Sequence, residues 1–432
     1  MVWLEYPMLD ITFIRDNLEA VEANILNRHM KADARAVVAL AEKRSQAIQK
    51  LEALRAGRNE NASKMKGKLE PSARQALVDE GKQIKDSLVA AEADLEAAEK
   101  NLKVELMRIP NMAHPQAPVG KEDKDNLEIK RVGQPTRLGF SALDHVQLGE
   151  KLDIIDFDAG TKVSGTKFYF LKNEGVFLEL ALTRFVLDLL VKKGFTPMIT
   201  PDIAKEEILE GIGFNPRGEE SNIYPLEGTG TCLVGTAEIT LGGYYADQIL
   251  DLSSGPIKMA GLSHCFRREA GAAGQFSKGL YRVHQFTKVE MFVFCRPDQS
   301  DALHEELRAI EEEIFSSLEI PFRVVDTCTG DLGAPAYRKY DLEAWMPGRG
   351  EGEWGEVTST SNCTDFQARR LGIRYKDDNG KNRPVHMLNG TAIAISRGII
   401  ALLENFQQAD GSVKIPKILV PYTGFDLIQP RR

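Results

Sequence analysis

The sequence reads Phe266-Arg267-Arg268-Glu269, then a glycine-rich loop over residues 270–279, then Leu280-Tyr281-Arg282-Val283-His284-Gln285-Phe286. Two strand-like runs that flank such a loop predict a β-hairpin, with Arg267 and Arg282 on opposing strands. Guanidinium groups match the oxygens of phosphate and carboxylate in bidentate fashion, so this arginine pair indicates an anion clamp. Cross-strand ion pairs with Glu269 and Glu290 are the alternative that needs no ligand.

A second apolar strand is predicted at residues 288–294, where alternation places Lys288 and Glu290 on one face. A carboxylate in an apolar strand is costly to bury unless it meets a cation or a hydrogen-bond donor. Glu290 is therefore either an edge residue that faces water or a ligand-binding carboxylate. The strand alone does not decide between the two.

The composition changes near residue 110. Residues 31–105 are rich in Ala, Glu, Lys, Gln and Leu, and their apolar residues recur in steps of three and four. This pattern predicts a long antiparallel coiled-coil hairpin that turns at residues 66–72, with Ser72 as the cap of the second helix. We expect an N-terminal domain over residues 1–110, with the hairpin at about 31–105, and a second domain over residues 111–432. Helical runs at 176–191, 298–318 and 393–406 mix with strands there without a regular βαβ repeat, which is typical of an α+β domain.

The net charge of the 432 residues is −8, which argues against a protein that holds nucleic acid by its overall charge. Residues 31–105, however, carry 15 Lys/Arg against 13 Asp/Glu, so the rest of the chain carries −10. The positive excess gathers near the predicted hairpin tip, at Arg55, Arg58, Lys64, Lys66 and Lys68. Such residues neutralise phosphates and predict a nucleic-acid contact. A solvated coiled-coil surface or a dimerisation arm is the alternative.

Several classes of protein are excluded by the sequence. No run approaches the roughly 18 apolar residues of a membrane span, and residues 1–10 lack the features of a secretory signal. The five cysteines are widely spaced without a CxxC pair, which suits reduced intracellular thiols. We expect a soluble cytoplasmic protein with no membrane partner. A processed protein of an organellar matrix would show the same features.

Near the C-terminus, residues 388–397 lead into an apolar helix with Arg397 at its start. An arginine there needs an anionic or aromatic partner, and a purine ring is one candidate. The sequence has no GxxxxGK[ST] loop and no GxGxxG after a strand. Any ATP would therefore be held by a different fold.

These runs resemble the motifs of class II aminoacyl-tRNA synthetases. The hairpin at residues 266–286 resembles motif 2, Gly194-Phe195-Thr196-Pro197-Met198-Ile199-Thr200-Pro201 resembles motif 1, and residues 390–397 resemble motif 3. The further runs at 162–165, 236–238, 279–286 and 360–367, with the helical arm, make the chain similar to seryl-tRNA synthetases of bacterial or organellar type from about Met8 to the C-terminus. The resemblance implies an antiparallel β-sheet catalytic domain flanked by helices, and a tRNA-binding hairpin.

The resemblance also implies a serine–tRNA ligase that uses ATP and Mg²⁺ to form seryl-adenylate and then charges tRNA(Ser). The serine-binding residues would be Thr236, Glu238, Arg267, Glu290, Asn389 and Thr391. The ATP-binding residues would be Arg267, Glu269, Arg282, Val283, Phe286, Glu356, Ser359 and Arg397. Arg267, Arg397 and Glu356 would be catalytic, Glu356 and Ser359 would hold Mg²⁺, and the basic residues of the hairpin tip would bind tRNA. Phe286 and Arg397 would sandwich the adenine.

Motif 1 implies a homodimer, and selenocysteine tRNA is a further substrate that the resemblance allows. The loop Gln275-Phe276-Ser277-Lys278 departs from the family pattern, which bears on tRNA selectivity more than on adenylation. The competing interpretations are a paralogue that activates serine for another acceptor or resists an inhibitor, and a non-catalytic tRNA-binding protein. The intact site residues and the retained hairpin favour the tRNA-charging enzyme.

Overall fold

The chain forms two compact units, Met1–Met112 and Ala113–Arg432. The computed structural model describes residues 10–67, 69–215, 221–270 and 278–431. None of the helices in these ranges is both long enough and apolar enough to cross a membrane.

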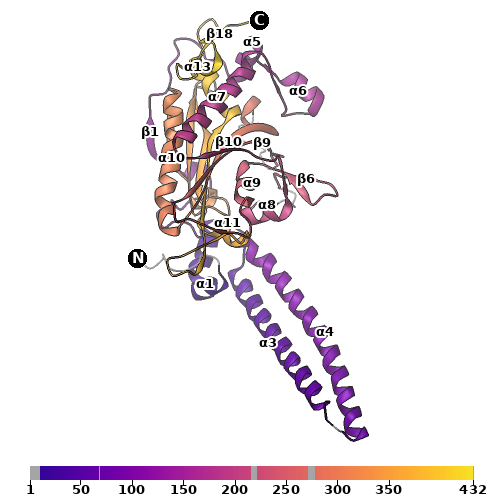
Figure 1. Cartoon of the computed structure of the whole chain (residues 1–432). Helices are drawn as coiled ribbons and strands as arrows, with labels where there is room; N and C mark the ends of the chain where they lie inside the picture. The colour runs from indigo at the N-terminus through magenta and orange to yellow at the C-terminus, as the bar shows by residue number, and fades with distance from the viewer. Residues whose placement is uncertain (1–9, 68, 216–220, 271–277, 432) are drawn as a thin grey trace. The chain divides into compact units, whose positions relative to one another are not determined.

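The first unit is built on a pair of long helices, α3 (Ala34–Lys64) and α4 (Pro71–Arg108), which lie side by side (Figure 1). Two short helices, α1 (Ile11–Asp16) and α2 (Leu18–Asn27), precede them. The predicted seam is present, because Leu51 on α3 packs in one cluster with Leu88 and Ala91 on α4. At about 1.5 Å per residue, the 31 residues of α3 span roughly 46 Å.

The end of the hairpin differs from the prediction in one detail. Helix α4 begins at Pro71 with Glu70 as the preceding cap residue, so the assignment of Ser72 as the cap is wrong. Proline is favoured at the first helical position because a backbone N–H, which proline lacks, would have no partner there, and the helix starts two residues earlier than predicted. Within the seam, Asn61 lies opposite Gly81 and donates hydrogen bonds to the Leu77 carbonyl at 3.1 Å and to Glu80 at 2.9 Å.

The second unit is organised around an eight-stranded sheet with the order β1-β11-β12-β13-β16-β10-β9-β4. Its strands are β1 (Leu127–Val132), β4 (Thr196–Ile199), β9 (Ile257–Phe266), β10 (Gln285–Cys295), β11 (Phe322–Asp326), β12 (Arg338–Met346), β13 (Glu353–Asn362) and β16 (His386–Ala394). Every neighbouring pair is antiparallel except β4 with β9. The predicted α+β class is confirmed.

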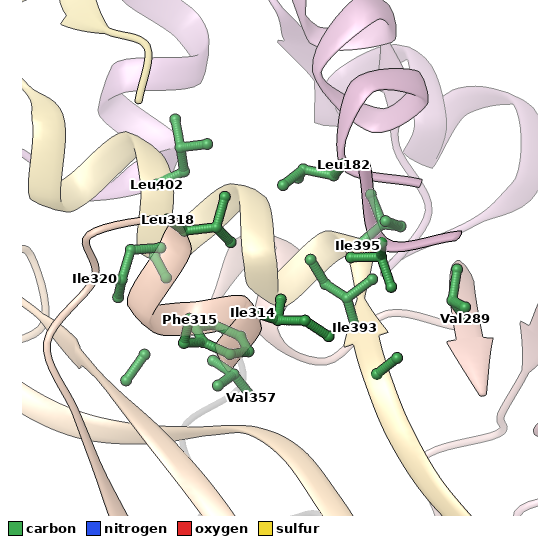
Figure 2. Packing of buried hydrophobic residues seen from close by; sticks show 14 of the residues in the cluster. Leu182, Val289, Ile314, Phe315, Leu318, Ile320, Val357, Ile393, Ile395 and Leu402 are labelled. Carbon is green, nitrogen blue, oxygen red and sulfur yellow. The ribbon is translucent and has the colours of Figure 1, made fainter. Parts of the chain in front are cut away.

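Helices cover both faces of this sheet. On one face, α7 (Glu174–Lys192), α10 (Ser300–Ser317) and α12 (Ile395–Phe406) share a core with the sheet, and Figure 2 shows Phe315 of α10 against Val357 of β13. On the other face, α8 (Glu206–Ile212) and α9 (Ala237–Gly243) pack with Phe292 of β10 in a second core. Alternation along β10 therefore sends Val289 to the first core and Phe292 to the second.

The remaining elements of the described ranges are short. They are η1 (Asp123–Asp125), α5 (His145–Lys151), β2 (Ile155–Asp156), α6 (Phe157–Ser164), β3 (Phe170–Leu171), β5 (Ile203–Lys205), β6 (Tyr224–Leu226), β7 (Thr231–Leu233), β8 (Ile249–Leu250), η2 (Gly279–Tyr281), η3 (Pro297–Gln299), η4 (Thr329–Asp331), α11 (Phe366–Arg370), β14 (Arg374–Lys376), β15 (Asn382–Pro384), β17 (Val413–Lys414), α13 (Val420–Thr423) and β18 (Leu427–Ile428). Of these, α5, η2 and α11 border the candidate active site.

The hairpin of strands β9 and β10 is present, with Phe266 opposite Gln285. Its second strand begins later than predicted, because Leu280 and Tyr281 lie in the 3-10 turn η2. Gly279 has φ +58°, a left-handed conformation that turns the chain before the strand can begin. Arg267 and Arg282 thus lie just beyond the paired strands, although the Arg267 N–H still donates to the His284 carbonyl at 2.9 Å.

Candidate active site

One cavity collects every residue that was predicted to bind ATP. The cavity lies where strands β10, β13 and β16 meet the start of α12 and the segment between β9 and β10. The eight predicted residues line it: Arg267, Glu269, Arg282, Val283, Phe286, Glu356, Ser359 and Arg397. Lys288 and Thr391 line the same cavity, and they connect it to a buried polar cluster described below.

Two arginine side chains form cation–π contacts with aromatic rings in this cavity. The Arg397 guanidinium lies 4.7 Å from the centre of the Tyr281 ring, and the Arg267 guanidinium lies 5.2 Å from that of Phe286. Such contacts place the positive charge against the electron-rich face of each ring. Phe286 and Arg397 thus line the same cavity, one with an aromatic ring and the other with a planar cation. The sandwich of adenine between them stays a prediction.

The charged residues that line the cavity form ion pairs, except for Arg267. Arg397 donates to the Glu356 carboxylate at 3.0 Å, and Arg282 donates to Glu269 at 3.1 Å. Burial opposes ionisation of Glu356, but Arg397 and Lys339 more than offset it and hold the pKa of this carboxyl below its usual value. Arg282 therefore forms one of the ion pairs that were expected if the two arginines bind no ligand. Arg267 instead donates to the Gly235 carbonyl at 3.2 Å.

A β-bulge brings Glu356 and Ser359 to the same side of the sheet. Three residues apart on a regular strand they would point to opposite faces, but the pairing of β13 with β12 slips between Thr358 and Glu356. Glu356 then lies opposite Glu343, and Ser359 lies opposite Asp341. The shift explains why a carboxylate and a hydroxyl at this spacing can face one ligand.

The same face carries further acidic residues, but they are engaged by cations. Burial raises the pKa of Asp341 to about 6, although Lys339 lies 3.4 Å away and lowers it. Glu343 pairs with Arg323. Across the described part of the chain, no group of three or more His, Cys, Asp or Glu side chains is arranged to hold a metal ion. Glu356 and Ser359 supply two hard oxygen donors, which suits Mg²⁺ because that ion keeps waters and phosphate oxygens in its shell.

A buried polar cluster adjoins the cavity and is centred on Glu290, which is 2% exposed. Strand β10 lies between β9 and β16, so the interpretation of Glu290 as an edge residue facing water is wrong. Its carboxylate forms an ion pair with Lys288 and accepts from the hydroxyls of Thr236 and Thr391, each at 3.4 Å. A slip in the pairing of β10 with β16 places Glu290 directly opposite Thr391.

Lys288 is a site residue that the sequence analysis did not assign. It is 4% exposed, and its ammonium group donates to Thr236 Oγ1 at 2.8 Å and to Thr391 Oγ1 at 3.4 Å. The available signal was its position two residues before Glu290, which places both side chains on one face of the strand. A lysine and a glutamate that share a buried face are each the charge partner the other needs.

Glu238 forms the other carboxylate of the polar cluster, at the start of α9. Its Oε1 accepts from the Gln367 amide at 2.8 Å and from the Asn389 amide at 2.9 Å. Burial, and then the negative charge of Glu290, raise the pKa of Glu238 to about 7. Gln367 is the second residue that the sequence analysis missed, since nothing in the run around it marks which side chain faces the site.

The predicted residues therefore fall into three places. Those for serine and ATP lie in the second unit, in the cavity and the polar cluster. In the hairpin of the first unit, Arg55 pairs with Glu92 at 3.4 Å, Lys64 pairs with Glu60 at 2.9 Å, and Arg58 and Lys66 are exposed. Lys68 and the loop residues Gln275, Phe276 and Ser277 lie outside the described residues.

Two family descriptions match the chain: "Seryl-tRNA synthetase N-terminal domain" over residues 8–113 and "tRNA synthetase class II core domain (G, H, P, S and T)" over residues 227–406. The fold and the site thus define a class II aminoacyl-tRNA synthetase. A serine–tRNA ligase of Treponema denticola is 69% identical over 98% of this chain and 100% of its own length. The chain belongs to the seryl-tRNA synthetase family, the serine–tRNA ligases of class II.

Solved structures agree with this assignment. The seryl-tRNA synthetase of Pyrococcus horikoshii, complexed with ATP, is 42% identical, with a TM-score of 0.90 over 98% of this chain and 100% of that one. The cytoplasmic serine–tRNA ligase of Naegleria fowleri, in complex with AMP, is 32% identical, with a TM-score of 0.85 over 99% of this chain and 100% of that one. The resemblance inferred from the motifs is confirmed.

The raised pKa of Glu238 predicts a pH-dependent stability. Glu238→Gln should raise the melting temperature at pH 8, and the gain should shrink as the pH falls towards 4.5. The folded-state pKa of about 7 lies above the ordinary 4.5, so ionisation of Glu238 between these values destabilises the fold. Glutamine stays neutral, and its side-chain oxygen can accept from the same two amides. Thermal unfolding at a series of pH values measures the difference.

Glu356→Gln is the matched control, with the opposite sign. The folded-state pKa of Glu356 is lowered, so its ionised form stabilises the fold above the ordinary pKa of 4.5, and this stabilisation is lost as the pH falls. This variant should melt below the wild type at pH 8 and approach it at low pH. A Glu238→Gln difference that is the same at every pH would contradict the assignment.

Proposed function

We propose that this chain activates serine with ATP to give seryl-adenylate and pyrophosphate, and then transfers the seryl group to the 3′ end of tRNA(Ser). The observation that carries the proposal is the buried Glu290 carboxylate, set opposite Thr391 beside the cavity that the ATP-binding residues line. A buried acceptor of this kind selects for a substrate hydroxyl. Alanine or glycine would leave it without the hydrogen bond that serine supplies, which disfavours both far more than shape alone could.

Serine would sit in the polar cluster with its three functional groups separated. Thr236 and Glu238 would receive the ammonium group, and Glu290 and Thr391 would receive the hydroxyl, with Asn389 alongside. Arg267, at the border with the cavity, would hold the carboxylate. Hydrogen bonds already present support this arrangement. Asn389 donates to Glu238 at 2.9 Å, Lys288 donates to Thr236 at 2.8 Å, and Thr236 donates to Glu290 at 3.4 Å.

ATP would occupy the cavity. Phe286 and Arg397 would hold the adenine between them, while Glu269 and the Val283 backbone would read its polar edge. Arg267 would face the α-phosphate, and Arg282 with Arg397 would face the β- and γ-phosphates. The serine carboxylate would attack the α-phosphorus in line and displace pyrophosphate, so positioning and charge stabilisation by these arginines would supply the rate enhancement without a protein nucleophile.

Mg²⁺ would be held by Glu356 and Ser359. The bulge places both donors on one side of the sheet, and the lowered pKa of Glu356 keeps its carboxylate ionised at neutral pH. When bound, the ion would supply positive charge that neutralises the phosphate oxygens. The chain's own contribution is to hold the two oxygen donors in place.

The first unit would bind tRNA. Its exposed basic residues near the turn of the hairpin, Arg58 and Lys66, offer charges to the phosphate backbone, and a two-helix rod can follow the shape of an RNA arm without reading bases. We place the enzyme in the cytoplasm, where charged tRNA is used.

Serine-dependent exchange of pyrophosphate into ATP tests the activation step. The wild-type chain should catalyse this exchange. Arg267→Ala should lower the rate at least about 100-fold because a charge clamp on the phosphate is lost. Glu290→Ala should lower the preference for serine over alanine.

Titration of Mg²⁺ in the same assay tests the metal ligands, and Ser359→Ala should need a higher Mg²⁺ concentration than the wild type.

Glu306→Ala is the control for this assay, because Glu306 pairs with Lys258 away from the cavity and should leave exchange unchanged. Absence of exchange in the wild type would rule out the proposed activation. Exchange that retains full serine preference in Glu290→Ala would overturn the assigned role of that carboxylate.

Charge reversal in the hairpin tests the transfer step. The double variant Arg58→Glu/Lys66→Glu should raise the KM for tRNA about ten-fold and weaken its salt dependence, because phosphate contacts are lost. Serine-dependent exchange should not change. The matched control is Lys103→Glu, an exposed lysine near the other end of α4. Equal effects of the control and the double variant on the KM for tRNA would argue against a tip contact.

We also propose that the chain is a homodimer through the motif 1 region. Phe177 and Leu180 of α7 are more than half exposed, and Ile199 at the end of strand β4 is 86% exposed. Exposed apolar side chains on a helix and on the edge strand beside it are typical of an association surface.

Sedimentation velocity checks the dimer. Wild-type chain should sediment with about twice the 48.0 kDa of one chain, and Leu180→Glu should shift it towards the monomer by placing a charge in the interface. Val119→Glu, at a 72% exposed position on another segment, should remain dimeric. A monomeric wild type at micromolar concentration would refute the proposal.

A further inference from the structure

His145, the first residue of α5, connects two walls of the ATP cavity without lining it. Its Nε2 accepts a hydrogen bond from the backbone N–H of Leu280 at 3.2 Å, and its Nδ1 lies 2.9 Å from Glu404 Oε1. The His145 N–H also donates to Glu404 Oε1 at 3.0 Å, and the Gly348 N–H donates to Glu404 Oε2 at 2.9 Å. His145 and Glu404 are 1% and 2% exposed.

The two partners define the state of the imidazole. A backbone N–H can only donate, so Nε2 must present its lone pair to Leu280. A carboxylate accepts, so Nδ1 carries the proton and donates it to Glu404. The His145 ring is thus a neutral bridge: it accepts a hydrogen bond from the Leu280 amide and donates one to Glu404.

Both ends of this bridge lead to proposed ATP contacts. Glu404 lies on α12, two helical turns after Arg397, so both side chains leave the same side of the helix about 10 Å apart along its axis. Leu280 precedes Tyr281, whose ring the Arg397 guanidinium covers at 4.7 Å. The next residue, Arg282, is a proposed phosphate ligand.

The approach of the backbone to His145 is close. A side-chain carbon on Gly279 would lie 2.3 Å from His145 Nε2, so only glycine fits against the imidazole at this point. Lys278, one residue earlier, forms an ion pair with Asp144, the cap residue of α5. The first turn of α5 therefore holds three consecutive residues at the exit of the motif 2 loop.

We propose that His145 is a positioning residue for ATP: it fixes the segment from Gly279 to Val283 against the helix that carries Arg397. The proposal rests on the proposed function, because Arg282, Val283 and Arg397 are taken as ATP ligands. Without the imidazole, the Leu280 amide is buried with no acceptor, and the segment must shift to reach water or another oxygen. Such a shift displaces Arg282 and Val283 relative to Arg397, while the serine cluster on strand β10 keeps its own contacts.

Two conservative variants separate the two hydrogen bonds. In His145→Asn the amide reaches as far as Nδ1, so the bond to Glu404 is kept and the acceptor for Leu280 is lost. In His145→Gln the amide oxygen reaches as far as Nε2 and restores that acceptor. In serine-dependent pyrophosphate exchange, His145→Asn should raise the KM for ATP about ten-fold with the KM for serine within two-fold of wild type, and His145→Gln should lie near wild type for both.

A partly buried histidine elsewhere in the same unit supplies the control. His386 hydrogen-bonds Ser300 Oγ through Nδ1 at 2.9 Å, and His386→Asn should leave both KM values unchanged. Three results would each overturn the positioning role. In His145→Asn, the KM for ATP could stay unchanged, or the KM for ATP and the KM for serine could rise equally. In His145→Gln, the KM for ATP could fail to return towards the wild-type value.

Hydrogen exchange of the wild-type chain tests the bridge without any substitution. The Leu280 amide should be protected to the same degree as amides of strand β10, and free exchange at Leu280 would overturn the proposal. Wild-type exchange of pyrophosphate is measured first: its absence refutes the proposed function, whereas normal wild-type activity with an unaltered His145→Asn refutes the role of His145 alone.

Discussion

The ion pair between Lys288 and Glu290, buried in the middle of an eight-stranded sheet, is the constraint on which the site depends. Each charge alone would be strongly disfavoured there, and removal of one partner from a buried pair typically costs about 3–5 kcal/mol. Thr236 and Thr391 add the hydrogen bonds that the pair still needs. The flanking strands and the helices on both faces keep water away from this pair.

Irregularities in the sheet, rather than its regular part, set the directions of the site residues. The slip between β12 and β13 brings Glu356 and Ser359 to one face, and the slip between β10 and β16 sets Glu290 opposite Thr391. The left-handed Gly279 turns the chain so that Tyr281 contacts Arg397 of α12. Bulges of this kind re-aim side chains without changing which strands pair.

The architecture could be predicted well because it follows from the periodic spacing of apolar residues in the sequence. Steps of three and four residues marked the coiled coil, and alternation marked strand β10 and the shared face of Lys288 and Glu290. The motifs led to the cavity residues, but the roles given to them remain proposals. The start of β10, the cap of α4, and the contributions of Lys288 and Gln367 were missed, since each depends on a backbone angle or a long-range contact that local pattern does not encode.

Asn61 gives the helical hairpin a fixed register. Asn61 is 8% exposed, and its amide donates to the Leu77 carbonyl and to Glu80 in a space that Gly81 leaves open. If α3 slid along α4 by one turn, that amide would lose its partners and a larger side chain would occupy the space. The distance from the base of the hairpin to its basic tip is therefore set by the pairing of the two helices.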